Sequence, residues 1–260
     1  MIIASYGGGT NSTAYIVKKV MLGEPIDLII FADTGGEKPH TYSYIPMFSE
    51  WLVSKGYPPI TVVKRVNDKG EIETLEEECL RLGNLPSIVF GKKTCSQKHK
   101  IAPQNKYINS LPEAKAIWKA GGKIVKYIGY DADEEYRVKP DEDKLDKKYD
   151  RQYPLIEWDM DRAACIEVIK SAGLPLPGKS ACYFCPSSKR TEIRWLHHNY
   201  PDLAERALAI EANGVGNANV VVGLGRNWRW QDVIHAEKNQ IDMLDEDYAR
   251  TPELLCGCID

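Results

Sequence analysis

Three absences limit what this 260-residue chain can be. It has no basic leader at its N-terminus, no apolar run near the roughly 20 residues that span a bilayer, and no large excess of either charge. The formal net charge of −3 gives no global drive towards nucleic acid or anionic membranes, although a local basic patch stays compatible with a nucleic-acid substrate. We therefore expect a cytoplasmic protein with no membrane partner, and we leave a homodimer open.

Two familiar phosphate-binding patterns are also absent, GxGxxG and GxxxxGK followed by Ser or Thr. Instead, three glycines separate the apolar run 1–5 from the mixed apolar pattern 14–21, an order that predicts a strand, a glycine turn and a helix. Glycines let a backbone approach a phosphate, and the amides at a helix start hold an anion. We predict a nucleotide-binding loop, with a plain glycine turn as the alternative, made of Tyr6, Gly7, Gly8, Gly9, Thr10, Asn11, Ser12 and Thr13.

Apolar runs along the first two thirds of the chain predict alternating strands and helices. Strands are expected at 26–32, 60–66 and 123–130, and helices at 42–55 and 161–172. This alternation predicts an α/β fold with a doubly wound parallel sheet, in which the charged run 140–150 is a solvated loop. The alternation stops after residue 178. We therefore expect a nucleotide-binding domain over 1–178 and a cysteine-bearing C-terminal helical region over 179–260.

The glycine loop resembles the SGGxDS signature of the PP-loop ATP pyrophosphatase superfamily. Gly7 stands at the first serine of that signature and Asn11 at its aspartate, so one hydroxyl and one charge are missing here. Three later segments resemble the phosphoadenylyl-sulfate (PAPS) reductase-like branch. They are Asp33–Tyr42, which is similar to DTGxxxPxTY, then Gly129–Arg137, and Tyr153–Trp158 followed by a helix.

The resemblance implies an adenine nucleotide alpha hydrolase-like fold that binds ATP or PAPS with Mg²⁺, the phosphates lying over residues 7–13. It implies that Asp33, Thr34 and Gly35 border the adenine and ribose, and that Gly129 belongs to the nucleotide site. Arg137 would then pair with a phosphate or sulfate, because a guanidinium matches those oxygens. A surface salt bridge with Glu134 or Asp133 is the alternative for Arg137.

Seven cysteines are many for a compartment where structural disulfides are uncommon. Cys79 and Cys165 lie in helical patterns, and we assign them to the core. The others suit soft-metal or redox chemistry. We hypothesise that a [4Fe-4S] cluster, with zinc as the alternative, is bound by Cys95, Cys182 and Cys185, with Cys258 or Cys256 as the fourth ligand. The alternative is that these are unconnected, reduced cysteines.

Basic and aromatic residues in three further segments are weighed against plain structural roles. The lysines around Cys95 could form an electropositive pocket, with a solvated basic loop as the alternative; they are Lys92, Lys93, Lys98 and Lys100. The interleaved Arg226, Trp228, Arg229 and Trp230 are interpreted as a packed loop before a helix at 232–238. His197 and His198 fall in a helical pattern from 189 to 199 and are not expected to be ligands.

These features favour an enzyme of sulfur chemistry over other classes. In the first hypothesis, ATP adenylates an acceptor with release of pyrophosphate, and sulfur then displaces AMP; the acceptor is a small metabolite, a tRNA or DNA. In the second, PAPS or adenylyl sulfate is reduced, with Cys256 or Cys258 attacking the sulfate sulfur and Arg137 aiding catalysis. In the third, the changes at Gly7 and Asn11 leave an inactive nucleotide-binding module.

Overall fold

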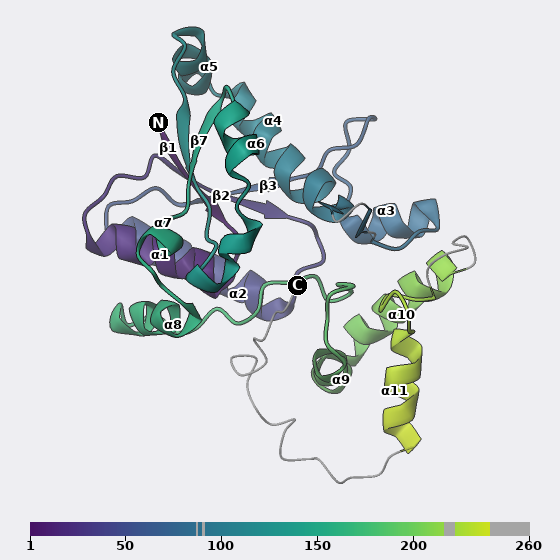
Figure 1. Cartoon of the computed structure of the whole chain (residues 1–260). Coiled ribbons are helices and arrows are strands. Elements are labelled where there is room, and N and C mark those ends of the chain that lie inside the picture. The colour runs from purple at the N-terminus through teal and green to yellow at the C-terminus, as the bar shows by residue number, and fades with distance from the viewer. Residues whose placement is uncertain (87, 90–91, 216–221, 240–260) are drawn as a thin grey trace. The chain divides into compact units, whose positions relative to one another are not determined.

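The chain divides into two compact units, seen in the computed structural model of Figure 1. The structure describes all residues except 87, 90–91, 216–221 and 240–260. The first unit comprises residues 1–32, 39–63 and 102–180, and the second comprises residues 33–38, 64–101 and 181–260. Each unit has its own buried apolar core.

A five-stranded sheet of strand order β3-β2-β1-β6-β7 organises the first unit. Its strands are parallel, and they are β1 (Ile2–Tyr6), β2 (Leu28–Asp33), β3 (Ile60–Lys64), β6 (Ile124–Tyr127) and β7 (Tyr149–Gln152). β1 lies at the centre, with Ala4 in register with Ile29 of β2 and Tyr127 of β6. Every residue of β2 is buried, as expected for a strand covered on both faces.

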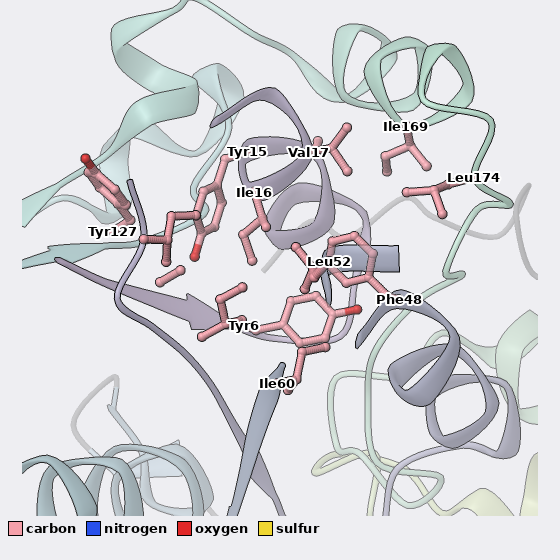
Figure 2. Packing of buried hydrophobic residues seen from close by; sticks show 14 of the residues in the cluster. Tyr6, Tyr15, Ile16, Val17, Phe48, Leu52, Ile60, Tyr127, Ile169 and Leu174 are labelled. Carbon is pink, nitrogen blue, oxygen red and sulfur yellow. The ribbon is translucent and has the colours of Figure 1, made fainter. Parts of the chain in front are cut away.

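Side chains that alternate along the strands supply two cores, one on each face of the sheet. On one face, Tyr6 of β1 and Phe31 of β2 pack with α1 (Thr10–Met21), α2 (Pro39–Ser54) and α8 (Arg162–Ser171) (Figure 2). On the other, Ile3 and Ile30 pack with α4 (Ala102–Ser110) and α5 (Pro112–Lys119). The fold is therefore α/β and doubly wound, as the sequence predicts.

The remaining elements of the first unit are short. They are the 3₁₀ helix η2 (Ala132–Arg137), α6 (Pro140–Leu145) and α7 (Pro154–Glu157). The run 140–150 is mostly exposed, as predicted, but the prediction of a loop is wrong, because α6 and the start of β7 occupy it. Pro140 begins α6, three acidic residues follow in its first turn, and Arg151 of β7 binds Asp143 and Asp146 at 2.9 and 2.5 Å.

The second unit is built from helices and a two-stranded antiparallel ribbon. The helices are α3 (Leu75–Leu82), the π-helix η1 (Ser96–Ile101), α9 (Arg190–Asn199), α10 (Pro201–Val215) and α11 (Trp230–Asn239), and the ribbon pairs β4 (Ile88–Val89) with β5 (Lys92–Lys93). Helices α3, α9, α10 and α11 share one apolar core. In the part of the chain that the structure describes, no helix combines the length and apolar character needed to cross a membrane.

The loop before α11 is packed, as the sequence predicts. Trp230 is 1% exposed, and the buried Glu211 carboxylate accepts hydrogen bonds from the amides of Leu224, Trp230 and Gln231 at 2.7, 2.9 and 3.1 Å. Trp228 lies half-buried beneath the guanidinium of Arg190, 5.3 Å from the ring centre. Packing therefore accounts for the two tryptophans, whereas Arg226 and Arg229 are exposed.

Candidate functional site

The glycine loop of the first unit joins β1 to α1 in the strand–turn–helix order that the sequence predicts. Gly9 caps α1 without a side-chain hydrogen bond, and the first turn of α1 carries no acidic residue. Gly8 has φ +78°, and a Cβ there would lie 2.9 Å from Thr41 Cγ2. Only glycine fits at this position. The uncapped start of a 12-residue helix presents backbone amides and a positive dipole end, which suit a phosphate.

The loop hydroxyls are used inside the loop itself. Ser12 Oγ and Thr13 Oγ1 donate to the carbonyl of Gly9 at 3.1 and 2.9 Å, and Ser180 Oγ donates to the carbonyl of Gly7. Contact of the Ser12 and Thr13 hydroxyls with a phosphate stays a prediction. The amides are the groups that the loop offers to an anion.

A polar cluster stands beside the loop, built around Asn11. Its side-chain amide donates to Asp131 Oδ2 at 2.8 Å and to Glu134 Oε2 at 3.2 Å, and its carbonyl accepts from Arg162 Nη1 at 3.4 Å. Arg162 also donates to Thr10 Oγ1 at 3.0 Å. Burial and the nearby Glu134 raise the pKa of Asp131. Arg162 therefore places a positive charge beside the loop, and Asp131 and Glu134 place negative charge there.

Two other predicted nucleotide-site residues have defined places in the first unit. A Cβ at Gly129 would lie 3.1 Å from Ser12 Cα, so its lack of a side chain lets the end of β6 approach the start of α1. Arg137 binds Glu134 at 2.5 Å and lies over the ring of Tyr130 at 4.3 Å. The ion pair with Glu134 is the alternative foreseen for Arg137, whose role towards a phosphate stays a prediction.

In the second unit, the segment after β2 forms a tight turn. The amide of Gly35 donates to Asp33 Oδ1 at 2.8 Å, and Lys64 binds Asp33 Oδ2 at 3.3 Å. Gly35 has φ +74°, and a Cβ there would lie 2.2 Å from Thr74 Cγ2. The turn explains why Asp and Gly stand at these positions. Contact of Asp33, Thr34 and Gly35 with a nucleotide stays a prediction.

The same turn holds the CxxC segment. Thr34 Oγ1 lies 3.1 Å from Cys182 Sγ, and the amide of Tyr183 donates to the carbonyl of Gly36 at 2.8 Å. Phe184 is fully buried, and a Cβ at Gly36 would lie 2.7 Å from its ring. The backbone amide of Tyr183 and the ring of Phe184 therefore hold the CxxC segment against this turn.

Among the three described cysteines of the predicted cluster, Cys185 lies within electrostatic range of both Cys95 and Cys182. Burial, followed by the neighbouring Cys185, raises the pKa of Cys95. Burial raises the pKa of Cys182 as well, and Glu37 and Cys185 add to this. The structure therefore gathers Cys95, Cys182 and Cys185, which lie up to 90 residues apart in the chain.

A lysine–glutamate pair borders these cysteines. Lys100 Nζ binds Glu37 Oε1 at 3.1 Å; the Glu37 side chain is fully buried and that of Lys100 is 35% exposed. Glu37 raises the pKa of Lys100, with smaller contributions of the same sign from Cys182 and Cys185. The ammonium in turn opposes the rise in the pKa of Cys95 and Cys182. It can thus stabilise thiolates in this corner of the second unit.

The predicted metal centre is not closed by the described residues. Across those residues, no three or more His, Cys, Asp or Glu side chains are arranged to hold a metal ion. Cys256 and Cys258, one of which was expected as the fourth ligand or as a nucleophile, lie outside the described residues. The donor chemistry fits a soft metal, three thiols beside an ammonium. The cluster stays a hypothesis, and we derive no chemical step through it.

An ionic network supports this corner of the second unit. Glu78, which is 5% exposed, accepts from His99 Nε2 at 2.7 Å, Arg65 at 2.7 Å and Lys98 at 3.0 Å. Burial opposes ionisation, but these three partners together lower the pKa of Glu78 to about 2. Lys98 is therefore committed to Glu78, as Lys100 is to Glu37. The charge of Lys93 lowers the pKa of Cys95, and the side chain of Lys92 is not described.

Sequence reasoning missed several residues of both sites. Arg162, Glu37 and Glu78 appear in the sequence only as members of helices or of a quoted motif. No spacing pattern singles them out, because each reaches its partner through the fold. The sequence offers one weak indication for Glu37. It follows the pair Gly35-Gly36 shortly after a buried strand, where an exposed turn residue would normally be expected.

Comparisons with known proteins add little. No protein-family model and no curated protein matches the chain. A solved structure that is similar in part is the U34-tRNA thiolase NcsA from Methanococcus maripaludis with its [4Fe-4S] cluster. The alignment has 13% identity and a TM-score of 0.41, and it covers 99% of this chain and 78% of that one. We draw nothing about function from a likeness of this degree.

Proposed function

We propose that the chain is an enzyme of sulfur chemistry that uses an adenine nucleotide, and specifically an ATP-dependent sulfur transferase. The observation that carries the proposal is the gathering of Cys95, Cys182 and Cys185 beside the ammonium of Lys100 in the second unit. A glycine turn before an uncapped helix in the first unit supplies the anion site that a nucleotide needs.

The proposed reaction has two steps. An acceptor oxygen attacks the α-phosphate of ATP, so that pyrophosphate leaves and an adenylated acceptor forms. A sulfur nucleophile then attacks the activated carbon, the C–O bond breaks, a C–S bond forms and AMP leaves. The amides of the loop and Arg162 hold phosphate oxygens, and Lys100 favours the thiolate form of its neighbours. A [4Fe-4S] cluster, where bound, would hold sulfur for transfer.

Metal analysis tests the cysteine half of the proposal. We expect anaerobically purified protein to contain iron and acid-labile sulfide, and Cys95→Ala, Cys182→Ala and Cys185→Ala each to lose both. Cys165→Ala is the matched control, because Cys165 is fully buried in the core of the first unit. Protein with zinc alone would make the cysteine site structural. Protein with neither metal would refute metal binding.

Nucleotide turnover tests the other half. A transferase forms AMP and pyrophosphate from ATP in the presence of its acceptor, and it loses product formation when Cys182 or Cys185 is replaced. The reductase alternative instead requires Cys256 or Cys258 and consumes PAPS without ATP turnover. Nucleotide binding without any product from either substrate would favour the inactive binding module.

A further inference from the structure

One carboxylate oxygen beside the glycine loop lacks a hydrogen-bond partner. Asp131 is 4% exposed; its Oδ2 accepts from Asn11, while its Oδ1 is buried and unpaired. Buried carboxylate oxygens normally accept at least one hydrogen bond. An oxygen that accepts none has lost its hydrogen bonds to water without gaining others, which costs free energy. The orphaned atom therefore calls for an occupant that donates a hydrogen bond or carries positive charge.

The surroundings of this oxygen are rich in oxygen ligands. Glu134 Oε2 shares the same Asn11 amide, at 3.2 Å, so the two carboxylates approach each other closely. The positive groups next to them are already engaged: Arg137 binds Glu134, and Arg162 binds Thr10 and Asn11. Two acids held together at the edge of a phosphate-type loop match the oxygen donors that a hard cation takes.

We propose that Asp131 and Glu134 form a divalent-cation site that is completed by the phosphate oxygens of a nucleotide bound at residues 7–13. This inference rests on the proposed nucleotide function. Mg²⁺ and Mn²⁺ are commonly held by one or two carboxylates together with substrate phosphates and water, rather than by a full protein cage. Two carboxylates therefore suffice as the protein ligands of such a site.

The site also balances charge at the loop. Asn11 brings no charge, so the carboxylates nearest to the first turn of α1 are those of η2 and of the residue before it. A cation bridging them to the phosphates would place the nucleotide at the open end of α1. The three groups that set its position would then be the loop amides, the two carboxylates and Arg162.

Binding of Mn²⁺, followed by electron paramagnetic resonance of the free ion, tests the proposal on the full-length protein. The titration is made with and without adenosine 5′-(α,β-methylene)triphosphate, which resists cleavage at the bond that the proposed reaction breaks. We expect tight Mn²⁺ binding only with the nucleotide, and Asp131→Asn and Glu134→Gln to weaken it about tenfold or more. Glu135→Gln is the control, because Glu135 is exposed on the same turn and loses the same charge.

Thermal melting separates a ligand role from a structural one. Without metal, we expect Asp131→Asn to melt no lower than the wild type, since an unpaired buried oxygen becomes a neutral amide. With Mn²⁺ and nucleotide, only the wild type and Glu135→Gln should gain stability. A melting temperature lowered equally with and without ligand would assign Asp131 a structural role and overturn the proposal.

Nucleotide affinity measured in EDTA distinguishes the two possible failures. Equal nucleotide affinity with Mn²⁺ and in EDTA, unchanged by Asp131→Asn, would overturn the cation site and leave the nucleotide function standing. No nucleotide binding under either condition would overturn the nucleotide function, and the cation site with it.

Discussion

Glu37 and Lys100 show how much one buried charge depends on its partner. The carboxylate of Glu37 is fully buried, whereas the ammonium of Lys100 is 35% exposed and keeps part of its hydration. A buried charge left without its counter-ion costs far more than a solvated one. The two members of this pair are therefore unequal in what their loss does to stability.

We predict that Lys100→Met destabilises the protein by about 2 kcal/mol, because the buried Glu37 carboxylate loses its ion pair with this ammonium. Glu37→Gln should cost less, since it leaves an ammonium that water reaches. The double variant should recover part of the loss. Urea unfolding of the four proteins measures this cycle, and equal costs for the two single variants would contradict the asymmetry.

At Gly8, we predict that alanine costs about 1–2 kcal/mol from the left-handed backbone alone, and more from the contact with Thr41. Gly23→Ala is the matched control, because Gly23 has φ +70° but nothing within 4 Å of its added Cβ. Urea unfolding should rank Gly8→Ala below Gly23→Ala in stability, and ATP titration should show weaker binding only for Gly8→Ala. Equal stability and equal ATP affinity of the two variants would show that the contact with Thr41 is not the reason for glycine at position 8.

At the scale of elements, capping residues determine where helix α3 begins and ends. Helix α3 begins with a capping box, in which Thr74 Oγ1 accepts from the amide of Glu77 at 3.1 Å and Glu77 accepts from the amide of Thr74 at 2.8 Å. It ends at Gly83, whose φ is +58°. These signals fix the length of α3 within the second unit.

We predict that Thr74→Ala destabilises the protein by about 1 kcal/mol, because the first turn of α3 loses its side-chain acceptor. Thr74→Ser keeps the hydroxyl and serves as the control, with a cost well below that of alanine. Guanidinium unfolding measures both. A serine variant as unstable as the alanine variant would show that the methyl contact with Gly35, not the cap, is what matters.

Periodicity was enough to predict β1, β2, β3, β6, α1, α2 and α8 of the first unit, but not its helices α4 to α7 or strand β7. The buried run at β2 and the amphipathic pattern at α8 carry strong local signals, and their bounds fall within two residues of expectation. The run 140–150 was mistaken because its acids are paired with Arg151, a partner that only the sheet register supplies. Cys95, Cys182 and Cys185 could be singled out from the sequence because cysteines are rare, and their role stays a prediction. Nothing in the sequence shows that Asp131 and Glu37 are buried, because the fold determines their burial.

On the scale of the whole molecule, acid should act on the second unit in two stages. Burial lowers the pKa of His99 below its ordinary value of 6.5. Just below pH 6.5, His99 is therefore protonated in the unfolded chain but still neutral in the folded protein. The hydrogen bonds to Glu78 hold its pKa at about 2, below its ordinary value of 4.5. In both cases the stabilisation is present at neutral pH and is lost as the pH falls.

We predict that the free energy of unfolding falls first as the pH drops below 6.5, through His99, and again below 4.5, through Glu78. His99→Gln should remove the first fall and keep the second. Urea unfolding between pH 7.5 and pH 3 measures both stages. A His99→Gln variant with the same loss between pH 7 and pH 5.5 as the wild type would assign that loss to other groups.

The interleaving of the two units along the chain has a consequence for biosynthesis. All segments of the first unit have left the ribosome's peptidyl centre by residue 180, whereas the second unit needs residues from 181 onwards. Glu37 and Lys100 are therefore synthesised before Cys182, which belongs to the last segment of the same unit. Every segment of the first unit is therefore synthesised before residues 181–260, so the first unit can begin to fold while the second still lacks its last segment.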